Sequence, residues 1–277
     1  MTALPARARR RHPAGAVLAA MLAGSWPAVI PATGRASSPA APLRLSYVLY
    51  GHGFHVMDVD ADVELTPVGY RISLHNRTAG LVGVLVHTDV TSIAVGRFDG
   101  ARAQPSGFAS SGQSRGAQRV ARIAYPDGVP QVLELTPVDH DRDPVAASAT
   151  VGSIDALSAV AALVHAVDQT GQCDGEARIF DGLRLSTLQA RTIGEQALPP
   201  SSNSPYSGPS LRCDFTGRQI GGFLHNADAA RLHRPQQGSA WLARPIPGAP
   251  QLPIRVTFEN PRFGRATLFL TRIVPQG

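Results

Sequence analysis

The sequence contains no lysine, and all 26 of its Lys and Arg positions are arginine. This absence excludes chemistry that depends on a lysine amine, including Schiff-base and PLP catalysis, a Ser-x-x-Lys nucleophile and a P-loop. Aromatic residues make up only 6% and charged residues 17% of the 277 positions. With 43% hydrophobic residues the chain has a globular composition, and its 27 glycines and 23 prolines favour turn-rich β architecture over a helix bundle.

Acidic residues are missing from the N-terminus, where the first is Asp58. An arginine-rich stretch at 7–12 precedes an apolar run at 14–30, and the small residues Gly34 and Ala36 follow. This order is typical of a secretory signal peptide, which we predict to span residues 1–36 and to be cleaved. The alternative is a membrane anchor, but a span needs about 20 apolar residues and this run is interrupted by glycine and proline.

Cleavage changes the charge of the protein. Residues 1–36 carry five arginines and no acids, so their removal lowers the formal net charge from +6 to +1. A nearly neutral chain lacks the basic surface that binds a phosphate backbone, and we predict no nucleic-acid partner. We expect a periplasmic protein with a leader at 37–42, a single β-rich domain at 43–275 and no transmembrane span after cleavage.

Cysteine is scarce, with only Cys173 and Cys213. In an oxidising compartment two cysteines most simply form one disulfide. Closing a loop of this length stabilises the fold by about 4 kcal/mol in the chain-entropy description. Free thiols and a metal or redox role are the alternatives, although no histidine or further cysteine lies nearby in the sequence for a zinc site. Since no cysteine precedes Cys173, we expect no lipid anchor.

Strict alternation of apolar and polar residues predicts paired strands. Residues 58–65 alternate Asp or Glu with Val, Ala or Leu, and 70–77 return with the same period after a turn at 66–69. A four-residue hairpin then pairs Leu65 with Tyr70 and Val63 with Ile72 on one face. On the other face it sets three acids opposite three bases: Glu64 with Arg71, Asp60 with His75, and Asp58 with Arg77.

The C-terminus follows the same pattern. Residues 254–259 alternate, a loop at 260–264 reverses the chain, and residues 265–274 return. Pairing Glu259 with Arg265 places Phe258 opposite Ala266, Val256 opposite Leu268 and Ile254 opposite Leu270. Further strands are expected at 43–50, 90–98, 118–125, 129–136, 176–180, 183–192, 211–217 and 239–243, with Asp-Gly turn signals at 99–100, 127–128 and 181–182.

One segment has helical spacing. From Ile154, apolar residues recur at Leu157, Val160, Ala161, Val164 and Val167. Ser153 or Asp155 can cap the start of this helix and Gly171 its end. Residues 79–86 could form a second, shorter helix or a buried strand.

Motifs for chemistry are mostly missing as well. There is no Gly-x-Ser-x-Gly elbow and no His-Glu-x-x-His pattern. His52 and His55 are interpreted as loop histidines rather than a metal pair, since no third ligand is evident. Residues 139–143 resemble a calcium loop at three positions but continue with Pro144 and lack a terminal Glu, which favours a polar turn. We assign no catalytic, cofactor or metal residue, and name only the disulfide Cys173–Cys213 as a site.

Several features follow one another in a recognisable order: Tyr50-Gly51 with Gly53, Asp155–Ser158, Cys173, Phe180–Gly182 with Arg184, Cys213 and Gly221–Phe223. This order resembles the uncharacterised, exported proteobacterial family named domain of unknown function 3108. Two departures are Ala156, where the family more often has proline, and the pair Leu185 and Ser186, where it is more polar. The resemblance implies an exported β protein built as a strongly curved antiparallel sheet or open half-barrel with one principal amphipathic helix.

Three functions remain open at this point. The first is a non-enzymatic periplasmic module that binds or carries a lipid or hydrophobic segment between sheet and helix. The second is a structural envelope protein whose partner is another protein, bound at the sheet edge or at the loop 199–210. The third is a hydrolase with paired carboxylates, such as Asp58 or Asp60 with Asp181, although the predicted register exposes Asp58 and Asp60 opposite basic residues.

Overall fold

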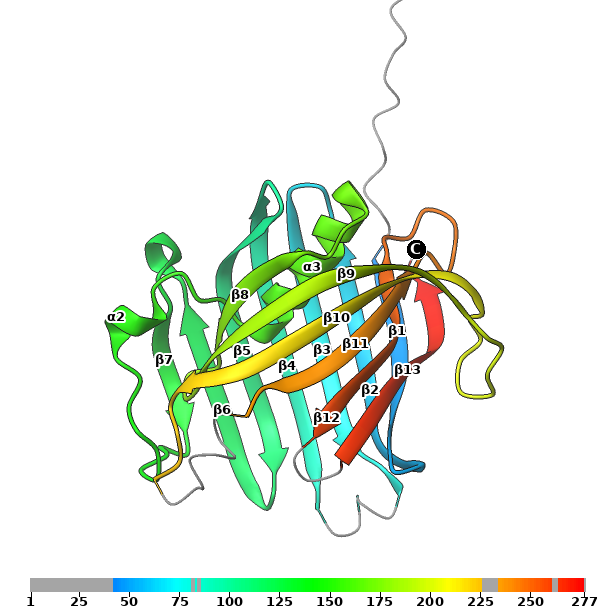
Figure 1. The fold of residues 1–277 in the computed structure, drawn as a ribbon. Helices are drawn as coiled ribbons and strands as arrows, with labels where there is room; N and C mark the ends of the chain where they lie inside the picture. Colours follow the sequence, from blue (N-terminus) through cyan, green and yellow to red (C-terminus); the bar gives the residue numbers. More distant parts are fainter. Residues whose placement is uncertain (1–41, 81–82, 84–85, 226–233, 261–263, 277) are drawn as a thin grey trace, which may run out of the picture. The chain divides into compact units, whose positions relative to one another are not determined.

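The computed structural model describes residues 42–80, 83, 86–225, 234–260 and 264–276, and these belong to one compact unit that begins at Ser38. The predicted signal peptide and most of the leader lie outside the described residues. Thirteen antiparallel strands form one sheet, shown in Figure 1. They are β1 (Leu43–Gly51), β2 (Phe54–Leu65), β3 (Gly69–Thr78), β4 (Thr88–Asp99), β5 (Arg102–Ser114), β6 (Ala117–Ala124), β7 (Gln131–Thr136), β8 (Gly175–Phe180), β9 (Leu185–Leu198), β10 (Gly208–Gly221), β11 (Gln236–Ala243), β12 (Leu252–Asn260) and β13 (Gly264–Pro275).

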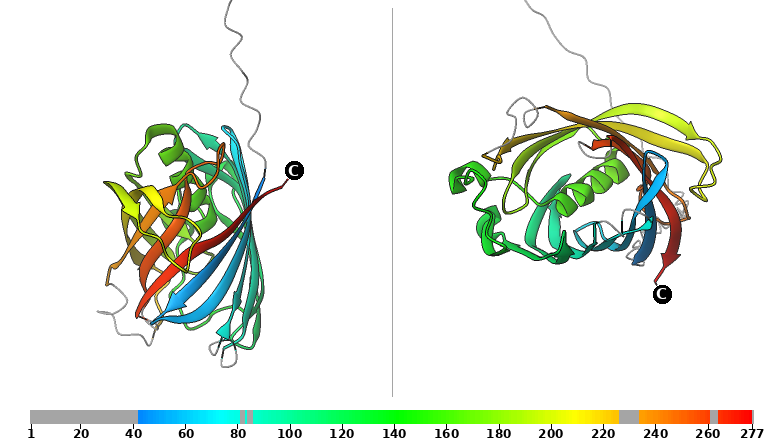
Figure 2. Two further views of the ribbon diagram at one scale, coloured as in Figure 1. Left: turned by 90° about the vertical axis from the view of Figure 1, so that its right-hand side faces the viewer. Right: turned by 90° about the horizontal axis from the view of Figure 1, so that it is seen from below.

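The sheet consists of two meanders joined by the first and last strands. Strands β1 to β7 pair each with the next, as do β8 to β13, and β1 pairs with β13. The terminal strands β7 and β8 do not pair with each other, so the sheet stays open. The view from below in Figure 2 shows it curling around one long helix. This confirms the predicted fold, a mainly β, strongly curved antiparallel sheet with one principal helix.

The alternation of side chains sets the two faces of the sheet. In the β2–β3 hairpin, Leu65 pairs with Tyr70 and Asp58 with Arg77, which is the predicted register. In the β12–β13 hairpin, Glu259 pairs with Arg265, also as predicted. The apolar partners therefore face the concave side and the charged partners face outward, because successive residues of a strand point to opposite faces.

The helix α3 (Ala156–Thr170) crosses the concave side of the sheet. Asp155 caps its start through the Ser158 amide, and Gly171, with φ of 71°, ends it in the left-handed conformation that glycine adopts without strain. The predicted apolar face needs one correction: Val160 is 44% exposed, and the short residues Ser158 and Ala159 are buried in its place. The face that meets the sheet is thus rotated toward small residues, which allow close approach.

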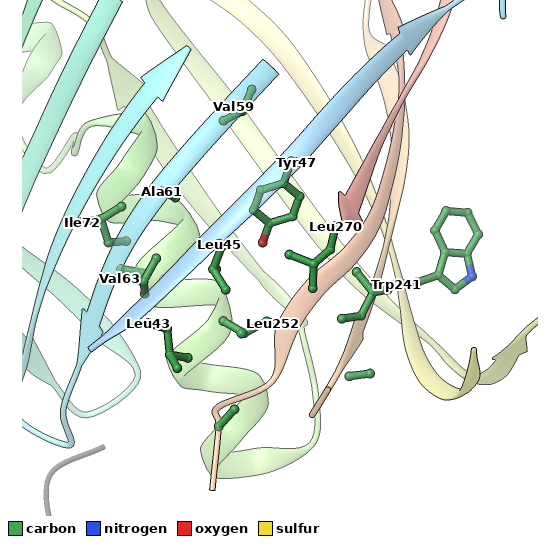
Figure 3. Packing of buried hydrophobic residues seen from close by; sticks show 14 of the residues in the cluster. Leu43, Leu45, Tyr47, Val59, Ala61, Val63, Ile72, Trp241, Leu252 and Leu270 are labelled. Atoms are coloured by element: carbon green, nitrogen blue, oxygen red, sulfur yellow. The ribbon is translucent and has the colours of Figure 1, made fainter. Parts of the chain in front are cut away.

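The core lies between α3 and the concave face. Figure 3 shows aliphatic side chains of β1, β2 and β13, including Leu45, Val63 and Leu270, gathered in one cluster. A second cluster joins Val164 and Val167 of α3 to strands β10 and β11. Since both meanders contribute to a core that α3 completes, the concave side is largely occupied by the protein itself.

The gap between the edge strands is bridged by the segment that precedes α3. Ile154 forms a parallel bridge with Ile179 of β8, through hydrogen bonds of 2.9 Å to Arg178 and Phe180. A third apolar cluster joins Ile123 of β6 to Phe180 of β8 across the same gap. This segment, which includes the short helix α2 (Ala147–Thr150), makes the open sheet barrel-like.

Three parts of the chain differ from expectation or lie partly outside the described residues. Strand β5 was not among the predicted strands, because its sequence is rich in serine, glycine and glutamine and shows no clear apolar alternation. Strand β9 extends to Leu198, six residues beyond the expected end. The possible second helix at 79–86 lies partly outside the described residues.

Candidate functional site

A buried polar cluster surrounds the start of α3. The Ser158 amide and hydroxyl donate to the two oxygens of Asp155 at 2.9 and 2.5 Å. The Tyr70 hydroxyl donates to Ser158 Oγ at 2.7 Å, and the Tyr125 hydroxyl lies 3.5 Å from Asp155 Oδ2. Asp155 is only 1% exposed. Residues of β3, of the turn after β6 and of α3 thus meet at one point.

Burial controls the electrostatics of this cluster. Desolvation raises the pKa of the Asp155 carboxyl, although the hydrogen bonds from Ser158 oppose the shift. Burial also raises the pKa of Tyr70 to about 12 and raises that of Tyr125. The hydroxyls therefore stay protonated as donors, and the cluster is built to hold the start of the helix.

An open cavity of about 790 Å³ adjoins this cluster, and we call it the seam cavity. It lies between the β4–β5 hairpin, the turn after β6 and the segment that enters α3. Its volume falls in the range that accommodates a small ligand. Apolar and small residues alternate with a few polar ones in its lining: Arg97, Ala103, Gln104, Pro105, Ser106, Ala124, Tyr125, Pro126, Asp127, Gly128, Gln131, Gly152, Ser153 and Ile154.

The two cysteines lie at the opposite end of α3. The sulfurs of Cys173 and Cys213 are at disulfide distance, 2.15 Å, and both residues are almost fully buried. The Cys173 amide donates to the Thr192 hydroxyl at 2.8 Å. The link ties the chain after α3 to strand β10 of the second meander.

The carboxylates considered for hydrolysis each contact a basic side chain. Asp58 lies 2.8 Å from His55, and Asp60 lies 3.5 Å from Arg77. Asp181 follows β8, where it accepts from the Leu183 and Arg184 amides and pairs with the Arg184 guanidinium at 2.7 Å. No contact joins Asp181 to the other two within the described residues, so the structure does not bring this pair together.

His55 and the acidic turn at 139–143 likewise contact partners of the opposite type. Besides the pair of His55 with Asp58, Asp139 pairs with Arg142 at 2.7 Å and Asp143 with His225 at 3.2 Å. His165 stacks on Phe98 with ring centroids 3.9 Å apart. Among the described residues no group of three potential ligands could hold a metal ion. In the same part of the chain, no helix combines the length and the apolar character needed to cross a membrane.

One arrangement on the outer face of the second meander was not predicted from the sequence. Arg212 of β10, Trp241 of β11 and Arg255 of β12 are cross-strand neighbours. The guanidinium of Arg255 lies 3.8 Å from the centre of the Trp241 ring, and that of Arg212 lies 5.5 Å from it. Trp241 belongs to the same apolar cluster as Leu270, and in Figure 3 its ring lies at the margin of that cluster. Only strand alternation could have indicated that these residues share a face.

Comparisons with known proteins support the fold. The chain matches the model of the family described as "Protein of unknown function (DUF3108)" over residues 44–271. It also resembles the crystal structure of a beta-barrel-like protein of domain of unknown function DUF1849 from Brucella abortus, with a TM-score of 0.52 and 12% identity over 85% of this chain and 98% of that one. At that identity the likeness concerns the fold alone. No curated protein matches the chain significantly.

Proposed function

This chain belongs to the DUF3108 family, and we propose from that premise that it is an exported, non-enzymatic binding protein of the cell envelope. Its ligand is apolar or amphipathic, a lipid or a hydrophobic segment, and its binding site is the seam cavity. The volume of that cavity, about 790 Å³, is the observation that carries the proposal.

The lining of the seam cavity suits a ligand with an apolar body and a polar end. Ala103, Pro105 and Ile154 offer apolar surface, while the exposed Arg97 and Gln104 supply polar groups at its margin. Ligand sites combine such mainly apolar walls with a few polar groups that orient the ligand. Gln131 of the edge strand β7 and Ile154, which pairs with the other edge strand β8, both line the cavity, so it lies beside the open edge of the sheet, where a ligand can enter without breaking strand pairs.

Two observations support a periplasmic location. The N-terminal pattern of arginines, apolar residues and small residues is typical of an export signal. The cysteine pair at disulfide distance suits an oxidising compartment, because cytosolic thiols are kept reduced.

Lipid extraction and mass spectrometry of protein purified from its native envelope test the proposal. We expect a co-purifying lipid, and we expect the delipidated protein to bind an apolar fluorescent dye that the lipid displaces. The substitution Ala124→Phe places a ring in the seam cavity, and it should lower both the amount of co-purifying lipid and the affinity for the dye by at least tenfold.

The matched control is Ala197→Phe, an exposed residue of β9 outside the cavity, which should bind as the unaltered protein does. A lipid-free preparation that ignores apolar dyes, or equal binding by both variants, would contradict the proposal.

A second candidate function is docking of another envelope protein at the sheet edge. Strand β7 ends the sheet, and Leu133 on it is 62% exposed. An exposed apolar edge strand is a template for pairing with another chain. Crosslinking in cells distinguishes this function: a Leu133-dependent heterologous product supports it, and monomer alone contradicts it.

A further inference from the structure

We propose that the outer face of β10–β13 carries a second binding site, specific for an oxyanion. Its centre is Arg255 stacked on Trp241, and its ligand is a small molecule bearing a phosphate or carboxylate group. The site lies on the convex side of the sheet, away from α3 and from the seam cavity, so it is independent of the function proposed above.

The site is an open cavity of about 660 Å³, which we call the outer cavity. Three arginines line it, Arg212, Arg255 and Arg265. Guanidinium groups are the donors that recognise oxyanions in proteins. The volume lies within the range of small-molecule sites.

Of the three arginines, Arg212 pairs with an acid of the outer cavity, and Arg255 has no ion-pair partner among the described residues. Asp214 accepts from both Nε and Nη2 of Arg212, at 2.9 and 3.1 Å, and from the Ser239 hydroxyl at 2.6 Å. Glu259 lies opposite Arg265 in the β12–β13 register. Within the described part of the chain, no acidic side chain lies within ion-pair distance of Arg255.

Arg255 is also poorly satisfied as a hydrogen-bond donor. Its Nε is buried and has no hydrogen-bond partner among the described residues. Burial, followed by repulsion from Arg212, lowers the pKa of its guanidinium. Both effects come from a half-buried cation without a counter-ion, which an incoming oxyanion would supply.

The orientation of Arg255 is fixed before any ligand arrives. Its guanidinium lies 3.8 Å from the Trp241 ring, and Trp241 is 6% exposed and held by a hydrogen bond from its Nε1 to Gln196 at 2.9 Å. The Trp241 ring lies against the guanidinium, whose planar set of N–H groups matches the geometry of an oxyanion. A rigid donor loses little freedom on binding, which favours affinity.

Trp241 itself provides the reporter for a test. The chain has two tryptophans, Trp26 and Trp241, so a Trp26→Phe background makes Trp241 the single source of tryptophan emission. Sodium phosphate and sodium acetate are titrated against sodium chloride at equal ionic strength. We expect a saturable change in emission with at least one oxyanion and none with chloride, and at least a tenfold loss of affinity in Arg255→Gln.

Two further variants keep the test interpretable. Arg77→Gln removes an ion-paired arginine from the outer face of the first meander and should bind as the parent does. Arg255→Lys keeps the charge but loses the planar stack, and it should bind between the parent and Arg255→Gln. Thermal unfolding establishes that each variant is folded.

Vesicles distinguish the two sources of the anion. Binding is compared on phosphatidylcholine vesicles with and without phosphatidic acid. Arg255-dependent binding that needs phosphatidic acid assigns the site to a lipid headgroup. Binding of free anions alone assigns it to a soluble ligand. The proposal is overturned if neither oxyanion gives a saturable response, or if folded Arg255→Gln responds as the parent does.

Discussion

The two meanders present very different outer faces although they belong to one sheet. In the first, charges are paired across strands: Arg44 contacts Asp62 at 2.8 Å, and Arg77 contacts Asp58 and Asp60 at 3.7 and 3.5 Å. In the second, Arg255 faces Trp241 instead of an acid. The same backbone alternation thus produces a neutralised surface in one half and an uncompensated cation in the other.

The meanders also differ in how they hold α3. The first contacts the start of the helix through Tyr70, which donates to Ser158, whereas the second is joined beyond its end by Cys213 and Cys173 and also pairs with Ile154 just before the helix. The attachment through Tyr70 and Ser158 is polar and depends on protonation, and the disulfide depends on oxidation. The following variants remove these two attachments one at a time.

The largest expected effect comes from removing the attachment to the second meander. Cys173→Ala with Cys213→Ala should lower the free energy of unfolding by about 4 kcal/mol, because the 40-residue loop regains its freedom in the unfolded chain. Denaturant unfolding with and without reductant measures it, and reductant should destabilise only the parent. If both thiols of native protein can be alkylated without reductant, the disulfide is not formed.

Removing the attachment to the first meander should cost somewhat less. Asp155→Ala deletes the helix cap and leaves the Ser158 hydroxyl without its acceptor, so the free energy of unfolding should fall by about 3 kcal/mol. The control is Asp181→Ala, which also accepts two backbone amides but in a partly exposed turn, and it should cost at most about 1 kcal/mol. Equal losses would show that burial does not distinguish the two carboxylates.

The polar attachment should also respond to pH. The pKa of Asp155 is raised by burial above its ordinary 3.8, so the folded protein holds this proton more tightly than the unfolded chain does. The stabilisation that comes from this tighter proton binding is complete below pH 3.8 and is lost as the pH rises through the pKa of Asp155 in the folded protein. Between pH 3.8 and the folded pKa of Asp155, the parent should lose stability relative to Asp155→Asn as the pH rises. Thermal unfolding at several pH values measures this loss. Parallel pH profiles would rule out the shift.

The smallest effects are expected on the outer faces. Arg77→Gln should lower the free energy of unfolding by less than about 1 kcal/mol and more weakly at high salt, since exposed ion pairs contribute little. Arg255→Gln should change it by less than about 0.5 kcal/mol, because the lost stacking on Trp241 is offset by removal of a half-buried cation. Chemical denaturation at two salt concentrations measures the free energy of unfolding of both variants. A large loss in Arg255→Gln would make the stack structural.

Much of the fold could be predicted from local patterns. The hairpin of β2 and β3 follows from the acids at Asp58, Asp60 and Glu64, which only one register sets opposite bases while burying the apolar face. Asp155 and Gly171 mark the ends of α3. Strand β5 could not be predicted in the same way, since it owes its place to pairing with β4 and β6 and not to its own composition.

The candidate sites were far less predictable. The seam cavity is lined by three segments that are far apart in the sequence, around residues 97–106, 124–131 and 152–154. The hydrogen bond from Tyr70 to Ser158 spans 88 residues. No local period indicates such meetings, because the order of the strands and the path of the linker determine them.

By itself the sequence determined most of the strands, the register of two hairpins, the ends of the helix and the chemistry that a chain without lysine cannot perform. These are consequences of the period of two in strands and of capping, which act over a few residues. The tertiary structure alone decided that β1 pairs with β13, that the sheet remains open, and that Arg255 lies against Trp241. Such contacts join distant segments, and they form only when the whole sheet has curved around its core.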